Sequence, residues 1–239
     1  MATRSYGQYC GVTTAVELIG ERWALLIVRD LLVGPRRYTD LKLGLPRIPT
    51  NILSTRLKEL QEGGVVRRVP LMHCGLVYEL TPYGRELEPI VLGLGRWGFA
   101  EMGDPAPDDV VTADSLTMAL RTAFRAEVAE TLPPAVYELH VGDIVLRAHV
   151  SGRDLVIAQL APAGRPVTPG SPRPTTEPGI VFAAGPGIRR IISGGLTPAE
   201  ALDRDVLAVI DGDATLLERF AETFHIDTAA VAAVGGKAS

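Results

Sequence analysis

The sequence predicts an α+β fold in two domains, and three observations lead to that prediction. The first hundred or so residues carry apolar side chains at three- and four-residue steps, which is the spacing of helices that bury one face. The second half alternates short apolar runs with turn residues, which is typical of antiparallel strands. Between them, residues 103–109 (GDPAPDD) have the composition of a linker. We therefore expect domains at residues 1–104 and 110–239.

The composition excludes several classes of protein. Hydrophobic residues make up 46% and charged residues 22% of the 239 residues, which is the balance of a globular chain rather than a disordered one. The 2 cysteines are too few for a disulfide framework, so a reducing, cytoplasmic setting is expected. The sequence begins without the apolar core of a signal peptide, and its apolar runs are shorter than a membrane helix needs. No membrane partner is therefore expected.

The first domain is expected to combine helices with a β-hairpin. In chain order the helices are predicted at residues 12–32, 38–43, 50–62 and 82–98, with hairpin strands at 65–69 and 76–80. Gly20 divides the first helix into two pieces, and the glycine pair at 63–64 ends the third because glycine tolerates a left-handed backbone. Thr81 and Pro82 suit the N-cap and first residue of the last helix, which Pro89 should kink.

The second domain is expected to alternate a sheet with short helices. The predicted elements are a helix at 115–132, strands at 136–141, 144–150 and 155–160, a proline-rich loop at 162–178, a strand at 180–184, helices at 187–193 and from 198, a strand at 206–210 and a final helix after 213. Turns at 142–143 and 151–154 predict that the first three strands form an antiparallel meander. Thr197 and Glu200 form a capping box, and Asp213 suits the N-cap of the final helix.

The order helix, short helix, turn, amphipathic helix and hairpin is that of a winged helix-turn-helix. In this fold the second helix of the pair lies in the major groove of DNA, and its outward side chains meet base edges. Here that helix covers residues 50–60, where Asn51 suits adenine and Arg56 suits guanine or a phosphate. The alternative is that these polar residues only solvate a helix face.

The distribution of charge favours the DNA interpretation. The net charge is −4, yet basic residues outnumber acidic ones between positions 36 and 68, as contacts to phosphates require. We therefore expect double-stranded operator DNA as a partner. The expected DNA-binding residues are Arg36, Arg37, Tyr38, Arg47, Pro49, Thr50, Asn51, Ser54, Thr55, Arg56, Lys58, Arg67, Arg68 and His73.

Several segments of the first domain resemble one family of bacterial regulators. They are Cys10 and the stretches LIGERW (18–23), LLVGPRRY (31–38), ILSTRLKEL (52–60), YELT (78–81) and GREL (84–87). In this order they resemble HxlR-type transcriptional regulators over about residues 8–102. The resemblance implies a homodimer, built from the first and last helices of the domain, on a pseudo-palindromic site with recognition helices about 34 Å apart. Two departures are the segment 71–75, which lacks the family's prolines, and Arg47, where a glycine is usual.

Cys10 raises a redox hypothesis. It immediately precedes the first helix, and a helix N-terminus can lower the pKa of a thiol. Some relatives of this family use an N-terminal cysteine as a redox or electrophile sensor, and Cys10 lies at the matching place. The alternative is a small hydrophobic residue buried in the dimer interface. One functional hypothesis is therefore a thiol-switched regulator whose second domain is only structural.

The second domain resembles the sterol-carrier-protein fold over residues 110–226. The resemblance is clearest at 194–202 (GGLTPAEAL) and from there through residue 214. It implies an α/β sandwich with a mainly antiparallel sheet that can open an apolar tunnel for a hydrophobic small-molecule effector. The expected ligand-binding residues are Phe182, Ile188, Ile191, Ile192, Phe220 and Phe224. The alternatives are that these side chains simply fill a core, or that the protein is a lipid carrier that does not bind DNA.

Enzyme chemistry has little support in the sequence. The 4 histidines lack metal-ligand spacing, and the sequence contains neither a glycine-rich phosphate loop nor a nucleophile motif. We expect no catalytic residues, no metal and no cofactor. The leading hypothesis is a dimeric repressor whose effector favours one dimer geometry over another.

Overall fold

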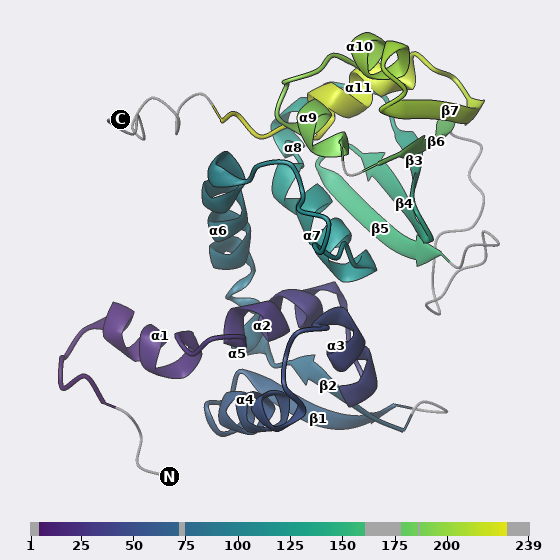
Figure 1. Cartoon of the computed structure of the whole chain (residues 1–239). Helices are drawn as coiled ribbons and strands as arrows, with labels where there is room; N and C mark the ends of the chain where they lie inside the picture. Colours follow the sequence, from purple (N-terminus) through teal and green to yellow (C-terminus); the bar gives the residue numbers. More distant parts are fainter. Residues whose placement is uncertain (1–4, 72–74, 161–177, 186, 229–239) are drawn as a thin grey trace. The chain divides into compact units, whose positions relative to one another are not determined.

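A computed structural model describes residues 5–71, 75–160, 178–185 and 187–228. The chain forms two compact units, Met1–Leu92 and Gly93–Ser239, and each contains both helices and strands (Figure 1). The boundary between the units falls inside a helix, whereas most of the expected linker lies outside any helix or strand. The division into domains 1–104 and 110–239 stays a prediction.

The first unit has the element order expected of a winged helix-turn-helix. Its elements are α1 (Gly11–Ile19), α2 (Ala24–Val33), α3 (Tyr38–Gly44), α4 (Thr50–Glu62), β1 (Val66–Leu71), β2 (Gly75–Leu80), α5 (Pro82–Arg85) and α6 (Glu88–Glu101), the last of which continues into the second unit. Strands β1 and β2 pair antiparallel, and Arg36 adds a short bridge to Tyr78 of β2. The predicted bounds of α4 are confirmed at both ends. The glycine pair follows its C-terminal end, and Gly64 adopts a left-handed φ of +70°.

One prediction for the first unit is wrong. The expected single helix at 82–98 is two helices, α5 and α6, so Pro89 lies in the first turn of α6 instead of kinking a longer helix. A proline fits there because the first turn of a helix has no internal partner for its N–H groups. The predicted cap is confirmed, since the Thr81 hydroxyl oxygen accepts a hydrogen bond from the N–H of Gly84 at 3.0 Å.

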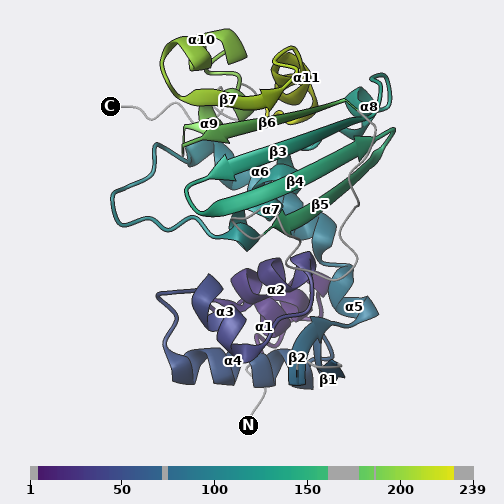
Figure 2. The same ribbon diagram turned by 90° about the vertical axis from the view of Figure 1, so that its right-hand side faces the viewer.

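The second unit is a five-stranded sheet with helices against one face. Its elements are α7 (Ala113–Ala123), α8 (Ala126–Ala129), β3 (Ala135–Val141), β4 (Ile144–Ser151), β5 (Asp154–Leu160), β6 (Gly179–Ala184), α9 (Ile188–Ile192), α10 (Pro198–Asp203), β7 (Leu207–Gly212) and α11 (Leu216–Thr223). The strand order is β5-β4-β3-β6-β7 (Figure 2). Only β3 and β6 pair in parallel, so the predictions of a meander and of a mainly antiparallel sheet are confirmed. Most of the proline-rich loop lies outside the described residues.

The predicted helix at 115–132 is wrong because two distant segments of this unit pair with each other. The expected helix at 115–132 is divided into α7 and α8 by Phe124, whose backbone is extended and forms a bridge with Phe224 after α11. The N–H of Arg125 donates to the carbonyl of Thr223 at 2.8 Å. This pairing between distant segments replaces the helical hydrogen bonds. The N-cap of α11 is Thr215, and the predicted cap, Asp213, accepts a hydrogen bond from the N–H of Thr215.

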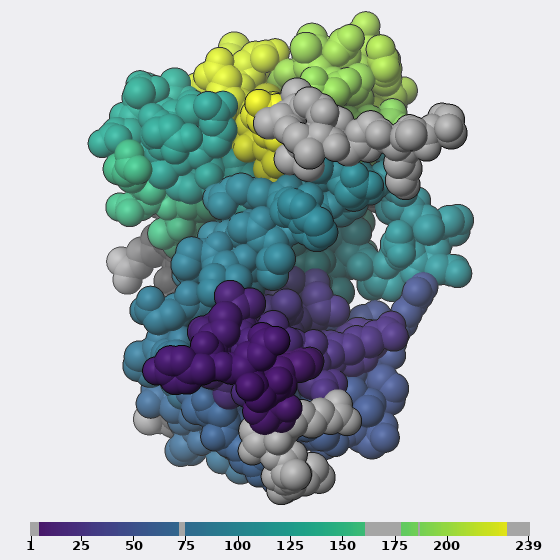
Figure 3. All heavy atoms as spheres, turned by 90° about the vertical axis from the view of Figure 1, so that its left-hand side faces the viewer, coloured from purple at the N-terminus to yellow at the C-terminus, as the bar shows by residue number. Residues whose placement is uncertain are grey.

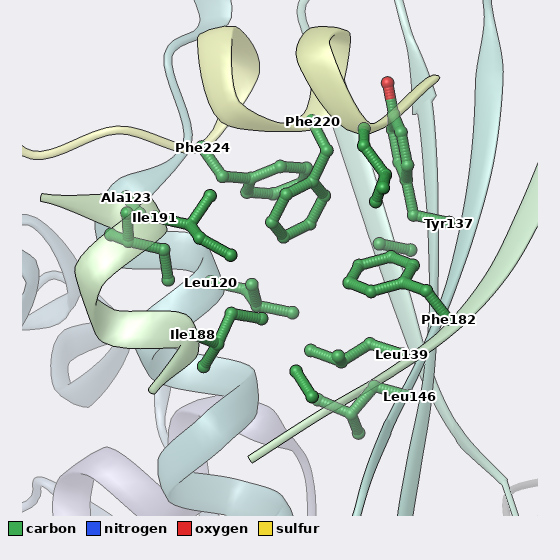
Figure 4. Packing of buried hydrophobic residues seen from close by; sticks show 14 of the residues in the cluster. Leu120, Ala123, Tyr137, Leu139, Leu146, Phe182, Ile188, Ile191, Phe220 and Phe224 are labelled. Carbon is green, nitrogen blue, oxygen red and sulfur yellow. The ribbon is translucent and has the colours of Figure 1, made fainter. Parts of the chain in front are cut away.

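Aromatic rings fill the core between the sheet and α11. The ring of Phe220 lies 5.4 Å from Tyr137, 5.2 Å from Phe182 and 4.7 Å from Phe224, measured between centroids (Figure 4). Alternate residues of β3, such as Tyr137 and Leu139, point into this core. The residues between them point to the opposite face, which no helix among the described residues of the second unit covers (Figure 2). Within the described residues, every helix is too short or too polar to span a lipid bilayer.

The central position of Phe220 predicts a large effect of truncation. Phe220→Ala should lower the free energy of unfolding of the second unit by about 3–5 kcal/mol, because it removes three ring contacts and leaves a cavity. Urea unfolding followed by circular dichroism measures this change. The matched control is Val156→Ala on the exposed face of the sheet, where 49% of the side chain is accessible. Equal effects of the two substitutions would contradict the proposed packing.

Candidate nucleic-acid interface and apolar cavity

The orientation of α4 is set by three leucines. Leu53, Leu57 and Leu60 are buried where α4 packs against α1, α2 and β1. A helix turns 100° per residue, so the residues between these leucines face away from the core. The outward residues are those predicted from the sequence, namely Asn51, Ser54, Thr55 and Lys58, and of these Asn51, Ser54 and Lys58 are exposed. The first unit therefore presents a polar helix face of the kind that enters a DNA groove.

Hydrogen bonds fix the angle between α3 and α4. The Tyr38 hydroxyl donates to the carbonyl of Thr50 at 2.9 Å and lies 3.2 Å from the hydroxyl of Ser54. The hydroxyl of Thr55 donates to the carbonyl of Asn51 at 2.9 Å. These contacts bring five predicted DNA-binding residues together at the N-terminal end of α4. The hydroxyl oxygens of Ser54 and Thr55 keep acceptor capacity on the outward face.

The turn between α3 and α4 is held by a lysine. Lys42 Nζ donates to the carbonyl of Pro46 at 3.2 Å and to that of Ile48 at 2.8 Å. This side chain therefore stabilises the turn instead of adding to its exposed charge. Arg47 and Pro49, both predicted at the DNA, lie exposed in the same turn.

Arg56 has an intramolecular role that its sequence position did not reveal. Its side chain is only 14% exposed and forms ion pairs with Glu21, at 3.2 Å, and with Glu59. Glu21 lies between α1 and α2, so the pair ties α4 to the start of the domain. A contact between Arg56 and a DNA base would require these ion pairs to break. We therefore assign Arg56 a positioning role, and its direct contact with DNA stays a prediction.

The wing carries exposed basic residues. Arg67 and Arg68 are exposed on β1, where Arg67 pairs with Glu79 at 2.6 Å and the Arg68 guanidinium lies 5.8 Å from the centre of the Tyr78 ring. Arg36, from the segment before α3, forms its backbone bridge to the same Tyr78. Arg37 is exposed at the start of α3. The remaining predicted wing residue, His73, lies outside the described residues.

Cys10, which the sequence placed just before the first helix, is the N-cap residue of α1, and its thiol is exposed in the single chain. Hydrogen bonding from the backbone of Thr13 and of Val12 lowers the pKa of the thiol below its ordinary value. A lowered pKa increases the thiolate fraction, and the thiolate is the form that reacts with oxidants and electrophiles.

Two helices present apolar side chains that the single chain leaves uncovered. On α1, Val12 and Val16 are exposed, and on α6 the exposed fractions are 44% for Leu94 and 69% for Trp97, with Ile90 also exposed. Both helices lie at the surface of the single chain (Figure 3). Large apolar side chains gathered on one helix face are typical of a surface that binds another protein.

The second unit contains a cavity of about 430 Å³. Its lining is mainly apolar and comes from the end of α6, the segment that follows, α7, the end of β3 and α9. The lining residues are Phe99, Met102, Gly103, Asp104, Pro105, Asp109, Val110, Val111, Ser115, Leu116, Ala119, Val141, Ile188, Arg189 and Ile192. A volume of this size lies within the range of about 300–1,000 Å³ that small-molecule sites occupy.

The cavity includes only part of the predicted ligand site. Ile188 and Ile192 line it. The other predicted residues are buried in the core and do not line the cavity; they are Phe182, Ile191, Phe220 and Phe224 (Figure 4). Sequence reasoning missed the contribution of α6, of α7 and of the segment between them. The available signal was Val110-Val111, an apolar pair at the end of a polar linker. Within the described residues, no cluster of side chains is suited to hold a metal ion.

Comparison with known proteins places the first unit among helix-turn-helix regulators. The family described as HxlR-like helix-turn-helix matches residues 18–105. The HTH-type transcriptional regulator YvaP of Bacillus subtilis is 38% identical over 94 residues, which cover 38% of this chain and 86% of YvaP. An HTH-type transcriptional regulator of Mycobacterium tuberculosis is 45% identical over 94 residues, covering 36% of this chain and 56% of that protein.

A further relative has a solved structure. The HTH-type transcriptional regulator YodB of Bacillus subtilis is 34% identical over 95 residues, which cover 38% of this chain and 85% of YodB. A crystal structure of quinone-bound YodB is 31% identical and covers 36% of this chain and 93% of that chain, with a TM-score of 0.33. These alignments span little more than a third of the chain.

The environment of Cys10 predicts its reactivity towards an alkylating reagent. An unperturbed cysteine has a pKa of about 8.5. In a Cys74→Ser background, the rate of alkylation by iodoacetamide should therefore reach half its maximum below about pH 8.5, because the backbone of α1 stabilises the Cys10 thiolate. Mass spectrometry after timed quenching measures the rate. The double variant that also carries Cys10→Ser is the control for labelling elsewhere. A midpoint at or above pH 8.5 would contradict the prediction.

Proposed function

Because this chain belongs to the HxlR-like helix-turn-helix family of transcriptional regulators, we propose that it is a homodimeric repressor controlled by an apolar small-molecule effector. The supporting observation is the orientation of α4. Its leucines bind the helix to the core of the first unit, and its outward face carries short hydrogen-bonding side chains. The first unit would bind operator DNA, and the second unit would bind the effector.

In this proposal α4 lies in the major groove and the hairpin lies along the phosphates. Asn51, exposed near the N-terminus of α4, can pair bidentately with an adenine, and Lys58 lies two turns further along the same face. Arg67 and Arg68 on β1 would contact phosphates. Arg56 would keep its ion pairs and hold α4 in position.

The uncovered apolar faces of α1 and α6 support homodimer formation. The family resemblance implies a dimer interface at the first and last helices of the domain, and these two helices expose Val12, Leu94 and Trp97. Burying such side chains against a second copy would remove apolar surface from water, which is the main driving force of association. Two copies would then present two α4 helices to the two halves of a pseudo-palindromic operator.

The cavity supports a sensory role for the second unit, for which we propose a sterol-carrier-like fold. Helix α6 carries Leu94 and Trp97 at its surface and Phe99 at the cavity. A ligand that binds better to one position of the α6 C-terminus than to another would shift the balance between dimer geometries. Such a shift changes the spacing of the two α4 helices and hence the affinity for the operator.

A thiol switch is the second candidate function. The observation that favours it is Cys10, whose thiol is exposed at the start of α1 and has a lowered pKa. In this alternative an oxidant releases the protein from DNA, and the Cys10→Ser variant no longer responds. An unchanged response in that variant removes the alternative and leaves the effector hypothesis.

Two kinds of substitution should separate base recognition from phosphate binding. On duplexes selected by the protein from a random pool, Asn51→Ala should lose about 1–3 kcal/mol of discrimination at one adenine position, because a bidentate pair is removed. The double variant R67Q/R68Q should bind all sequences more weakly and lower the slope of log affinity against log salt by about 1 per lost phosphate contact.

Fluorescence anisotropy with labelled duplexes at several salt concentrations measures both effects. The matched control is Arg204→Gln, which removes an exposed arginine at the C-cap of α10 in the second unit. If Asn51→Ala binds with unchanged sequence preference, α4 is not the recognition helix. If R67Q/R68Q keeps the full salt dependence, the hairpin does not contact phosphates.

The exposed face of α6 should be required for dimer formation. Leu94→Glu places a charge among apolar side chains that the proposed dimer buries, so the variant should be a monomer at micromolar concentration. Size-exclusion chromatography with light scattering gives the mass. The control is Leu202→Glu, an equivalent change at a partly exposed leucine of α10. A Leu94→Glu variant that remains dimeric would place the interface elsewhere.

A further inference from the structure

One arginine in the wall of the cavity has an unused hydrogen-bond donor. Arg189 of α9 lines the cavity, and its guanidinium lies 5.3 Å from the centre of the Phe99 ring. Its Nε is buried and has no hydrogen-bond partner among the described residues. A buried donor without an acceptor is unfavourable, so a bound molecule that supplies an acceptor would be stabilised there.

The carboxylates near this arginine already have partners. Asp104, which also lines the cavity, binds Arg190 at 2.6 Å, and the hydrogen bond from Arg190 lowers the pKa of its carboxyl group. The positive charge of Arg189 also lowers the pKa of the Asp104 carboxyl group. The carboxylate of Asp109 accepts a hydrogen bond from the N–H of Ala106 at 2.8 Å. Arg189 is therefore the lining residue that combines a positive charge with a free donor.

The remaining wall suits a hydrocarbon or aryl group. Leu116 and Ala119 from α7 and Ile192 from α9 contribute apolar surface. Met102 and Val110, in the segment between α6 and α7, also line the cavity, and they are 49% and 62% exposed. An apolar ligand that covers these side chains removes their surface from water.

We propose that this cavity binds a small apolar carboxylate, with its apolar body against α7 and the segment before it and its carboxylate on Arg189. An arginine and a carboxylate form charge-assisted hydrogen bonds in a planar geometry that suits both groups. An alcohol of the same shape supplies a weaker acceptor, and an ammonium group would face the positive charge of Arg189. The carboxylate is the effector class for the regulator proposed above, and in that respect the inference rests on the proposed function.

The site also has a direct connection to α6. Phe99 belongs to the last turns of that helix, Met102 follows its end, and Arg189 stacks on Phe99 from α9. A carboxylate on Arg189 would hold α9 and the end of α6 together through this stacked pair. The same ligand would therefore restrict the position of the α6 C-terminus, which is the movement that the proposed regulation requires.

Isothermal titration calorimetry of the full chain with matched probes tests this inference. The probes are decanoate and 2-naphthoate, together with decanol and 2-naphthylmethanol, at pH 7.4, where both acids are ionised. We expect each acid to bind at least tenfold more tightly than its alcohol. Arg189→Gln should remove this difference, because the charge and the guanidinium donors are lost. Arg204→Gln, which removes an exposed arginine at the C-cap of α10, should preserve it.

A second variant tests the location without changing any charge. Ala119→Trp places a large ring in the cavity from α7, so it should weaken the binding of acids and alcohols alike by at least tenfold. Circular dichroism and the thermal midpoint of each variant show whether the second unit remains folded. The comparison between acid and alcohol uses the unmodified chain. It therefore shows whether the protein prefers a carboxylate even if a variant does not fold.

The outcomes separate the ligand site from the proposed function. Equal binding of acid and alcohol, or binding of neither class, overturns the inference. If the acid binds through Arg189 but leaves the affinity for operator DNA unchanged, the inference stands and the effector role fails. If the protein binds its operator but no carboxylate, DNA binding stands and the ligand site proposed here is wrong.

Discussion

The burial of three leucines on one face of α4 is the constraint on which the DNA-binding surface depends. Leu53, Leu57 and Leu60 pack into the core of the first unit, and the outward direction of Asn51, Ser54 and Lys58 follows from helical geometry. Rotating the helix by one residue would expose a leucine and bury Asn51 or Lys58 without partners, which is strongly unfavourable. The polar face therefore needs few dedicated contacts, because the core already orients it.

Charge is distributed in agreement with this division of roles. The chain is acidic overall, with a net charge of −4, but the segment around α4 and the hairpin is basic. Part of that positive charge serves the structure, since Arg56 and Lys42 hold α4 and the preceding turn through ion pairs and carbonyl contacts. The exposed remainder, such as Arg68, is available to phosphates. A basic side chain near a recognition helix is thus not by itself a DNA contact.

Local sequence signals predicted most of the fold, and the errors have one non-local and one local cause. The bounds of α4 followed from its apolar spacing and a glycine pair, and the cap at Thr81 followed from local chemistry. The split between α7 and α8 did not, because it depends on pairing between Phe124 and Phe224, one hundred residues apart. The misplaced kink at Pro89 had a local cause, since a proline suits the first turn of a helix as well as it breaks a longer one.

In the candidate sites too, residues set by a single helix could be predicted, whereas contacts between distant segments could not. The outward residues of α4 could be named from the sequence because a single helix determines them, whereas the ion pairs of Arg56 bring Glu21 from another part of the domain. The cavity is assembled from the end of α6, the segment after it, α7, the end of β3 and α9, so periodicity indicated the apolar residues of α9 but not Phe99 or Arg189. The phenylalanines expected at the ligand are buried in the core and do not line this cavity.

In the proposed complex, a dimer of this chain contacts DNA with two α4 helices. Hydroxyl-radical footprinting of the full chain on a duplex that it selects from a random pool tests this binding mode. We expect two protected patches related by a two-fold axis, with centres about one helical turn, roughly 34 Å, apart on one face of the duplex. A single protected patch, or uniform protection that disappears when the salt concentration is raised, would contradict it.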